Sequence, residues 1–149
     1  GGVGIVEKNG NVTLFEFGRY SGSKKGMGLT KIANIGKVAK LDFKGKLLNA
    51  NEVAKLIKQK SQGDGKKHKM NGYVVPLPDV TSALSFAKRE GQKSYDIIDM
   101  DANDDDYNCG TFGISVAKAG GIPLADYCFP TPISALNSFE SHSVGSVSA

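Results

Sequence analysis

Cys109 is the residue of this chain whose type and position best suit nucleophilic chemistry. The apolar spacing of Phe112 and Val116 predicts a helix that starts near this cysteine, and Asn108 is a natural N-cap before it. The exposed N–H groups and the dipole of a helix N-terminus stabilise a thiolate, and the same N–H groups can hold an oxyanion. Gly110 leaves room for a substrate beside the sulfur. A buried and inert cysteine is the alternative interpretation of this pattern.

A cysteine nucleophile needs a base within hydrogen-bond reach of its thiol, and histidine commonly fills that role. The chain contains two histidines. His68 lies in a Lys-Lys-His-Lys run and His142 lies in a serine-rich tail, so we expect both to be solvated surface residues. The composition alone therefore supplies a nucleophile without an evident base.

Acidic residues gather between positions 99 and 106. The Asp-x-Asp-x-Asn pattern that starts at Asp99 matches the first half of an EF-hand calcium loop. The glycine and the glutamate that such a loop needs in its second half are replaced by Asp104 and Gly110. We therefore expect no metal ion and no cofactor, and we interpret the run as a solvated acidic loop beside the site.

The elements that must position these residues are expected to form a single α+β domain over residues 1–149. An Asn9-Gly10 pair between two β-rich runs predicts an N-terminal hairpin. The serine-rich tail from residue 138 is expected to fray. The predicted elements are a hairpin of residues 3–7 and 12–17, helices that begin near Asn49 or Asn51, near Asp79 or Thr81 and at Cys109, and strands at 37–43, 73–77 and 95–100.

The composition indicates an ordinary globular domain, because 40% of the residues are hydrophobic and 23% are charged. No apolar run approaches the roughly 20 residues that a membrane span needs, so we expect no membrane partner. The chain begins in a predicted strand and shows no signal peptide, so we expect a C-terminal fragment of a longer protein.

The net charge of +4 comes from lysines, many of them within residues 24–46 and 66–69. Such a surface attracts polyanions, including nucleic acid, wall polymers and membrane lipids, although solvated surface lysines are the simpler interpretation. A nucleic acid is not the expected partner, because the chain lacks a recognition motif with interleaved aromatic residues. Cys109 and Cys128 could form a disulfide or stay free, and the sequence leaves both states open.

Two stretches of the chain, taken together, resemble the permuted branch of the NlpC-type papain-like cysteine hydrolases. The first stretch is Gly-Gly-Val-Gly-Ile-Val-Glu at 1–7, followed by Thr-Leu-Phe-Glu-Phe-Gly-Arg-Tyr at 13–20. The second is Tyr-Asn-Cys-Gly-Thr-Phe at 107–112. In the permuted order the histidine strand precedes the cysteine helix, as in toxin domains carried by Rhs and VgrG proteins of type VI secretion.

The resemblance implies a papain-like fold in which an antiparallel sheet packs on the helix that carries the cysteine. It implies Cys109 as the nucleophile, a histidine at position 2 as the base, and Glu16 as the group that orients the imidazole. The remaining site residues that it implies are Asn108 and Gly110 at the helix cap and oxyanion site, and Arg19, Tyr20 and Tyr107 as candidates for the substrate cleft.

The activity that the resemblance implies is that of an antibacterial toxin. Such a secreted effector acts in the periplasm or cell envelope of a target cell and hydrolyses amide bonds, above all in the peptide part of peptidoglycan. An immunity protein that neutralises the toxin is the implied partner. Deamidase, protease and acyltransferase activities use the same site and stay open as alternatives.

Position 2 is a glycine in this chain, so we expect the enzyme to be inactive in this form. Three explanations stay open: a substitution that inactivates a toxic enzyme, the loss of the native histidine at the boundary of a fragment, or a naturally inactive domain. If the glycine is natural, a catalytically inactive binding module becomes the alternative function.

The register of the N-terminal hairpin decides whether position 2 and Glu16 can meet. Side chains alternate between the two faces of a strand, and directly paired residues share a face. A two-residue turn at Asn9-Gly10 puts position 2 and Glu16 on opposite faces. A three-residue loop at residues 9–11 puts them on the same face.

Overall fold

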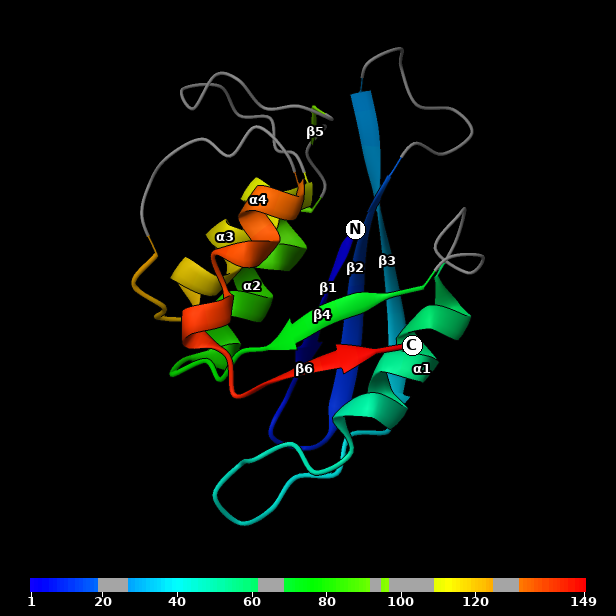
Figure 1. Ribbon diagram of the computed structural model, residues 1–149, viewed down its shortest axis with the longest axis vertical. Helices are drawn as coiled ribbons and strands as arrows, with labels where there is room; N and C mark the ends of the chain where they lie inside the picture. The colour runs from blue at the N-terminus through cyan, green and yellow to red at the C-terminus, as the bar shows by residue number, and fades with distance from the viewer. Residues whose placement is uncertain (19–26, 62–68, 92–94, 97–108, 125–131) are drawn as a thin grey trace.

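The computed structural model describes residues 1–18, 27–61, 69–91, 95–96, 109–124 and 132–149 (Figure 1). These residues form a four-stranded antiparallel sheet in the order β1-β2-β3-β5 and a separate two-stranded antiparallel sheet of β4 and β6. The strands are β1 (Gly2–Val6), β2 (Asn11–Gly18), β3 (Met27–Lys37), β4 (Asn71–Val74), β5 (Tyr95–Asp96) and β6 (Gly145–Ser148), and the helices are α1 (Ala50–Lys60), α2 (Val80–Glu90), α3 (Cys109–Ala119), α4 (Pro132–Asn137) and η2 (Glu140–His142).

The β1–β2 hairpin turns through a three-residue loop at residues 8–10. The N–H of Glu7 donates to the carbonyl of Asn11, and the N–H of Gly10 donates to the carbonyl of Glu7, both at 2.9 Å. Gly10 has a φ of 89°, a left-handed conformation that glycine adopts without a steric penalty. The turn expected at Asn9-Gly10 is confirmed, but a two-residue turn is wrong, and the three-residue loop lies one position earlier than expected.

The observed register pairs Gly2 directly with Glu16. Both residues therefore lie on one face of the hairpin, while Val3 and its partner Phe15 lie on the other. The hairpin is covered on both faces, because helices pack against each of them.

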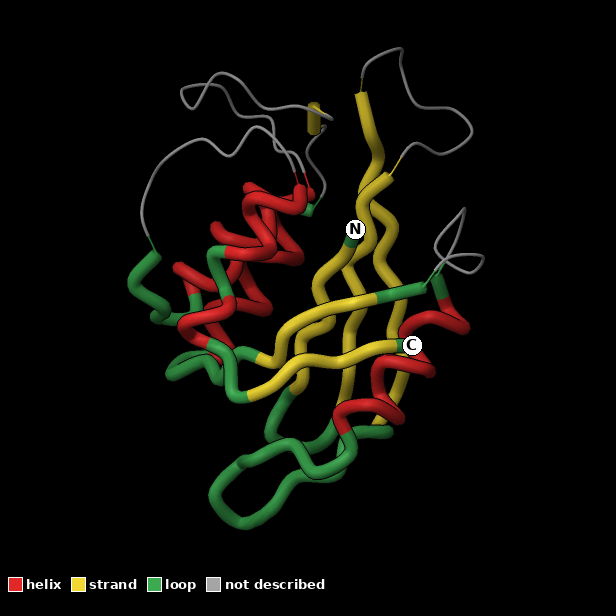
Figure 2. The backbone as a smooth tube through the Cα atoms, in the orientation of Figure 1, coloured by secondary structure: helices red, strands yellow, loops and turns green. Residues whose placement is uncertain are grey.

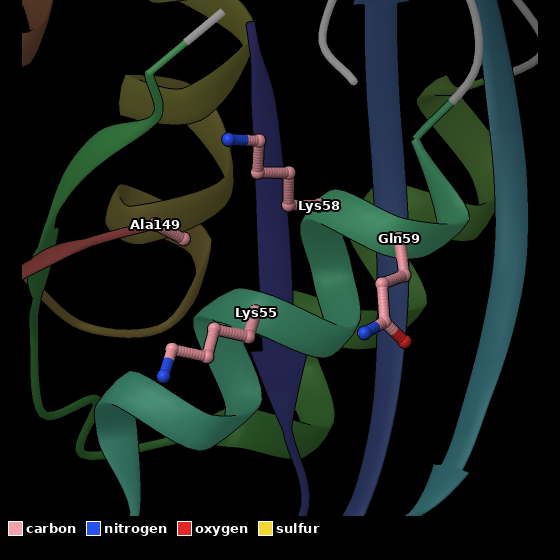
Figure 3. A pocket seen from close by; sticks show the side chains of 4 residues that line it. All are labelled: Lys55, Lys58, Gln59 and Ala149. Atoms are coloured by element: carbon pink, nitrogen blue, oxygen red, sulfur yellow. The ribbon is translucent and has the colours of Figure 1, made fainter. Parts of the chain in front are cut away.

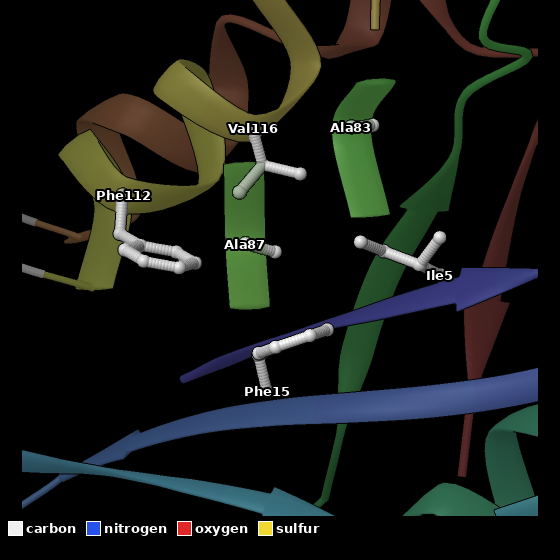
Figure 4. Close-up of a cluster of buried hydrophobic side chains, with 6 residues drawn as sticks. All are labelled: Ile5, Phe15, Ala83, Ala87, Phe112 and Val116. Atoms are coloured by element: carbon white, nitrogen blue, oxygen red, sulfur yellow. The ribbon is translucent and has the colours of Figure 1, made fainter. Parts of the chain in front are cut away.

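Helices α2 and α3 pack on the face that carries Phe15. The ring of Phe15 lies 6.5 Å from the ring of Phe112 in α3, measured between centroids. Figure 4 shows these side chains filling the space between the hairpin and the two helices. The antiparallel sheet therefore packs on the helix that begins at Cys109, as expected. The buried cluster consists of Ile5, Phe15, Ala83, Ala87, Phe112 and Val116.

Helix α1 covers the opposite face of the hairpin. A side chain at Gly4 would place its Cβ 2.7 Å from Cδ1 of Ile57, so the glycine allows α1 to approach β1 closely. The buried side chains Val53 and Ala54 line the inner side of α1, and Val12 and Leu14 of β2 are buried as well. The sheet is thus the middle of three layers, with α1 on one side and α2 and α3 on the other (Figure 4).

The α+β class and the three long helices are confirmed. The strand expected at 73–77 forms earlier, as β4 at Asn71–Val74, and two further expectations are wrong. No strand covers residues 37–43 as expected. Strand β3 lies almost wholly before this range and ends at Lys37, and an irregular loop follows it. The tail from residue 138 does not fray, because η2 and β6 form there and β6 pairs with β4. Both errors concern pairings between distant segments, for which the local sequence carries little signal.

The expected strand at 95–100 is described only at Tyr95–Asp96, where β5 pairs with β3, and its remainder lies outside the described residues. In the described part of the chain, no helix combines the length and apolarity needed to cross a membrane.

Asp79 caps α2, and its role predicts a pH-dependent loss of stability. Its carboxylate accepts a hydrogen bond from the hydroxyl of Ser82 at 2.6 Å and another from the N–H of Ser82 at 3.0 Å. These bonds, the side-chain bond first, hold the pKa of Asp79 below its ordinary value of 3.8. Because the pKa is lower in the folded state, the stabilisation is present above 3.8 and is lost as the pH falls through the folded-state pKa.

We expect Asp79→Ala to lower the melting temperature near neutral pH, and the difference from wild type to shrink at about pH 3 and below. Thermal melts followed by circular dichroism measure both effects. Ser85→Ala, an exposed serine on the same helix, is the control. If Asp79→Ala lowered the melting temperature by the same amount near neutral pH and at about pH 3, the result would contradict the assignment of Asp79 as the cap.

Candidate functional site

Cys109 is the first residue of α3, an 11-residue helix. The prediction that this cysteine stands at the start of a helix is therefore confirmed. The N–H groups of the first helical turn have no partners within a helix, and they carry the positive end of the helix dipole. The backbone at Cys109 thus offers the environment in which a thiolate is stabilised. Asn108 and Tyr107 lie outside the described residues, as do Arg19, Tyr20 and Cys128.

The first turns of α3 lie against the beginning of β1. A Cβ added to Gly113 would lie 3.5 Å from Cγ2 of Val3 and 4.0 Å from the ring of Phe139. Gly113 is four residues after Cys109, which places the two residues on nearly the same side of the helix. Both distances are ordinary van der Waals contacts, so β1 and the segment after α4 lie next to α3 here, and a Cβ at position 113 would also fit.

Glu16 lies on the other face of the sheet and is only 8% exposed. Its Oε1 accepts a hydrogen bond from the hydroxyl of Ser61, the residue that ends α1. A buried carboxylate costs free energy unless its oxygens have hydrogen-bond donors, and Ser61 supplies one. The structure therefore brings Gly2, Glu16 and Ser61 together on the α1 face of the hairpin.

Position 2 and the beginning of α3 thus lie on opposite faces of β1. Gly2 is the first residue of this strand, it is exposed, and β1 is an edge strand of the described sheet. A side chain at position 2 would have to turn around the free edge of β1 to approach α3. Its Cβ would lie 3.1 Å from the carbonyl oxygen of Phe15, so the strand end would shift by a few tenths of an ångström.

Ser61 is the residue that the sequence reasoning missed. It begins a polar, glycine-containing stretch at residues 61–69, whose composition is typical of a loop, and residues 62–68 of that stretch, His68 among them, lie outside the described residues. Its contact with Glu16 joins residues 45 positions apart, so no local pattern could have revealed it. The sequence shows only that Glu16 stands between apolar residues of a predicted strand, which indicates that a donor is needed if the strand is buried, but not which residue supplies it.

His142, the other histidine, lies in η2 near the beginning of β6. Across the described ranges, no three histidine, cysteine, aspartate or glutamate side chains gather closely enough to hold a metal ion. The acidic run at 99–106 falls outside those ranges.

A pocket of about 480 Å³ lies along α1, and it does not adjoin Glu16 or α3 in its lining (Figure 3). Its polar side chains end in two amines and one amide, so the lining contains no thiol, hydroxyl or carboxylate side chain. The pocket therefore does not mark the candidate site. It is lined by Lys55, Lys58, Gln59 and Ala149.

We predict that Ser61→Ala lowers the free energy of unfolding by about 1–2 kcal/mol, because it removes a donor from a buried carboxylate. The matched control is Ser85→Ala, which removes an exposed hydroxyl and should change stability by less than about 0.5 kcal/mol. Urea unfolding of the two variants measures the difference. Equal stabilities for both variants would show that Ser61 does not support Glu16.

Comparison with known proteins gives a match to a family model. A family model described as "Type VI secretion system effector TseH-like" matches residues 1–121, which is most of the chain. No curated protein matches the chain, and no solved structure matches it. The matched range includes β1, β2 and the whole of α3.

Proposed function

Because the chain belongs to the TseH-like family of type VI secretion system effectors, we propose that it is an antibacterial cysteine hydrolase with Cys109 as its nucleophile. Membership in an effector family implies that the protein is secreted. The observation that supports the chemistry is the position of Cys109 as the first residue of α3. A thiolate there is stabilised by the free N–H groups of the helix.

In the proposed reaction, the Cys109 thiolate attacks the carbonyl carbon of an amide. The oxyanion that forms accepts hydrogen bonds from N–H groups at the start of α3, with Gly110 leaving space beside them. A protonated imidazole gives its proton to the leaving amine, and the same imidazole then removes a proton from the water that hydrolyses the thioester. The cysteine is regenerated, and an acid and an amine are released.

The base in this proposal is a histidine at position 2, oriented by Glu16, as in the permuted papain-like hydrolases that the sequence resembles. The direct pairing of Gly2 with Glu16 supports the role of Glu16 in orienting this histidine, because the two side chains would be neighbours. For a histidine at position 2 to act as the base for Cys109, its imidazole must reach around the edge of β1. Asn108 as helix cap, and Arg19, Tyr20 and Tyr107 as cleft residues, complete the proposed site.

The proposed substrate is the peptide part of peptidoglycan in the periplasm of a target cell. The chain carries a net charge of +4, which favours contact with an anionic wall polymer. Deamidase, protease and acyltransferase activities would use the same thiolate. An immunity protein that covers or distorts the cleft is the proposed partner in the cell that makes the toxin.

We expect Gly2→His to release stem-peptide fragments from purified peptidoglycan, while the chain with glycine at position 2 releases none. Mass spectrometry of the soluble products identifies the bond that is cleaved. Adding Cys109→Ala to the Gly2→His variant should return the release to the level of buffer. Release that survives Cys109→Ala would overturn the assignment of the nucleophile.

A matched variant tests which face of β1 must carry the base. Val3→His places the same imidazole one residue further along, on the face that packs against α3. Activity in Gly2→His alone supports a base that reaches around the strand edge. Activity in Val3→His alone would overturn the assignment of position 2. If Gly2→His and Val3→His both fold and both are inactive, the proposal of wall hydrolysis loses its support.

The second candidate function is an inactive binding module, favoured by the glycine at position 2 and by the placement of Glu16 away from α3. In that case, the chain as it stands should sediment with insoluble peptidoglycan, and Gly2→His should add no hydrolysis.

A further inference from the structure

The segment from Lys37, the last residue of β3, to Asn49 forms an ordered loop. Oδ1 of Asp42 accepts the N–H groups of Lys44 and Lys46, each at 2.9 Å, which fixes a tight turn. At the base of the loop, the side chain of Asn49 accepts the N–H of Lys40 at 2.8 Å and donates to the carbonyl of Val38 at 3.0 Å. An isolated bridge between Leu41 and Leu47 joins the two arms. The tip is therefore held in one conformation.

Phe43 stands at this tip and is 94% exposed. Leu48, in the second arm, is 62% exposed. The ammonium of Lys44 lies 5.5 Å from the centre of the Phe43 ring, so a positive charge accompanies the apolar tip. A single exposed apolar residue on a surface is ordinary. Phe43 differs because it stands at the tip of a hydrogen-bonded loop, where the described residues leave its side chain almost fully exposed.

The loop is strongly basic. Lys37, Lys40, Lys44 and Lys46 are all exposed, and the acidic side chain among residues 37–49 is that of Asp42, which is bonded to the backbone. Four lysines and one aspartate give this segment a net charge of +3. Glu52 at the start of α1 is a nearby carboxylate, and it accepts a hydrogen bond from Asn49. The charge around Phe43 therefore stays positive.

We propose that this loop binds the surface of an anionic lipid bilayer, with Phe43 inserted among the headgroups and the lysines contacting lipid phosphates. Aromatic side chains favour the membrane interface, and basic residues near them are attracted to anionic lipids. The expectation of no membrane partner rested on the absence of a spanning segment, which does not bear on peripheral binding.

A bilayer fits this loop better than a protein partner does. A stable protein interface buries on the order of 800 Å² on each side, with several apolar residues at its centre. This loop offers two exposed apolar side chains on a narrow projection, which a bilayer can accept and a rigid protein surface cannot cover efficiently. A nucleic acid could stack a base on one aromatic ring, and the experiment below distinguishes that case.

The loop lies away from the candidate site. The N–H of Ala39 donates to the carbonyl of Gly10, which ties the loop to the turn of the β1–β2 hairpin. Gly2 is at the other end of β1, roughly 14 Å away for four residues of strand. Figures 1 and 2 show the loop projecting beyond the ends of the strands. Bilayer binding through the loop would thus leave α3 and the start of β1 accessible.

The chain contains no tryptophan, so Phe43→Trp introduces a single fluorescent reporter at the tip. We expect its emission to shift to shorter wavelength with vesicles of phosphatidylcholine and phosphatidylglycerol, and to stay unchanged with phosphatidylcholine alone. High salt should reverse the shift. Val144→Trp is the matched control, because Val144 is 67% exposed and lies outside the loop, and its emission should not change.

Vesicle sedimentation of the chain without a tryptophan measures its partition coefficient between water and the bilayer. Phe43→Ser should lower the partition coefficient about tenfold, and replacing Lys40, Lys44 and Lys46 together by glutamine about a hundredfold. Val144→Ser should leave it unchanged. The proposal is overturned if the chain does not sediment with anionic vesicles at low salt, if Val144→Ser weakens binding as much as Phe43→Ser, or if Phe43→Trp responds to single-stranded DNA and not to vesicles.

Discussion

The register of the β1–β2 hairpin is the constraint on which the rest of the structure depends. The three-residue loop pairs Gly2 with Glu16 and Val3 with Phe15, and it thereby assigns every side chain of both strands to one face or the other. A shift by one residue would move Phe15 out of the core and carry Glu16 into it. The left-handed conformation at Gly10 stabilises the loop that prevents this shift.

Because side chains alternate between the two faces of the hairpin, the residues of each strand enter two different environments. On the α2 and α3 face, the alanines of α2 and the rings of Phe15 and Phe112 belong to one apolar cluster. Thr13, which pairs with Ile5, is a buried polar residue on the same face. On the α1 face, a carboxylate is buried beside Leu14 and is supported by the end of α1 through Ser61. Any reaction that combines Cys109 with Glu16 must therefore operate across the edge of β1, where the two faces meet.

Apolar burial and positive charge are also separated along the length of the molecule. The core cluster lies between the sheet and α3, whereas the basic loop projects from the turn end of the hairpin. An effector that cleaves a polymer and contacts a membrane, as we propose, needs these regions to work without blocking each other. The length of β1 provides that distance, because it joins the turn to the start of the candidate site.

The sequence by itself determined the elements whose signals are local: the turn at Asn9-Gly10, a helix that begins near Asp79 or Thr81, and the helix that begins at Cys109. Two short motifs also pointed to an effector of type VI secretion, which the family match supports. Only the tertiary structure decided the hairpin register, the contact of Ser61 with Glu16 and the pairing of β6 with β4. These depend on contacts between residues far apart in the chain, and such contacts are selected by burial and packing of the whole fold, which no local pattern encodes.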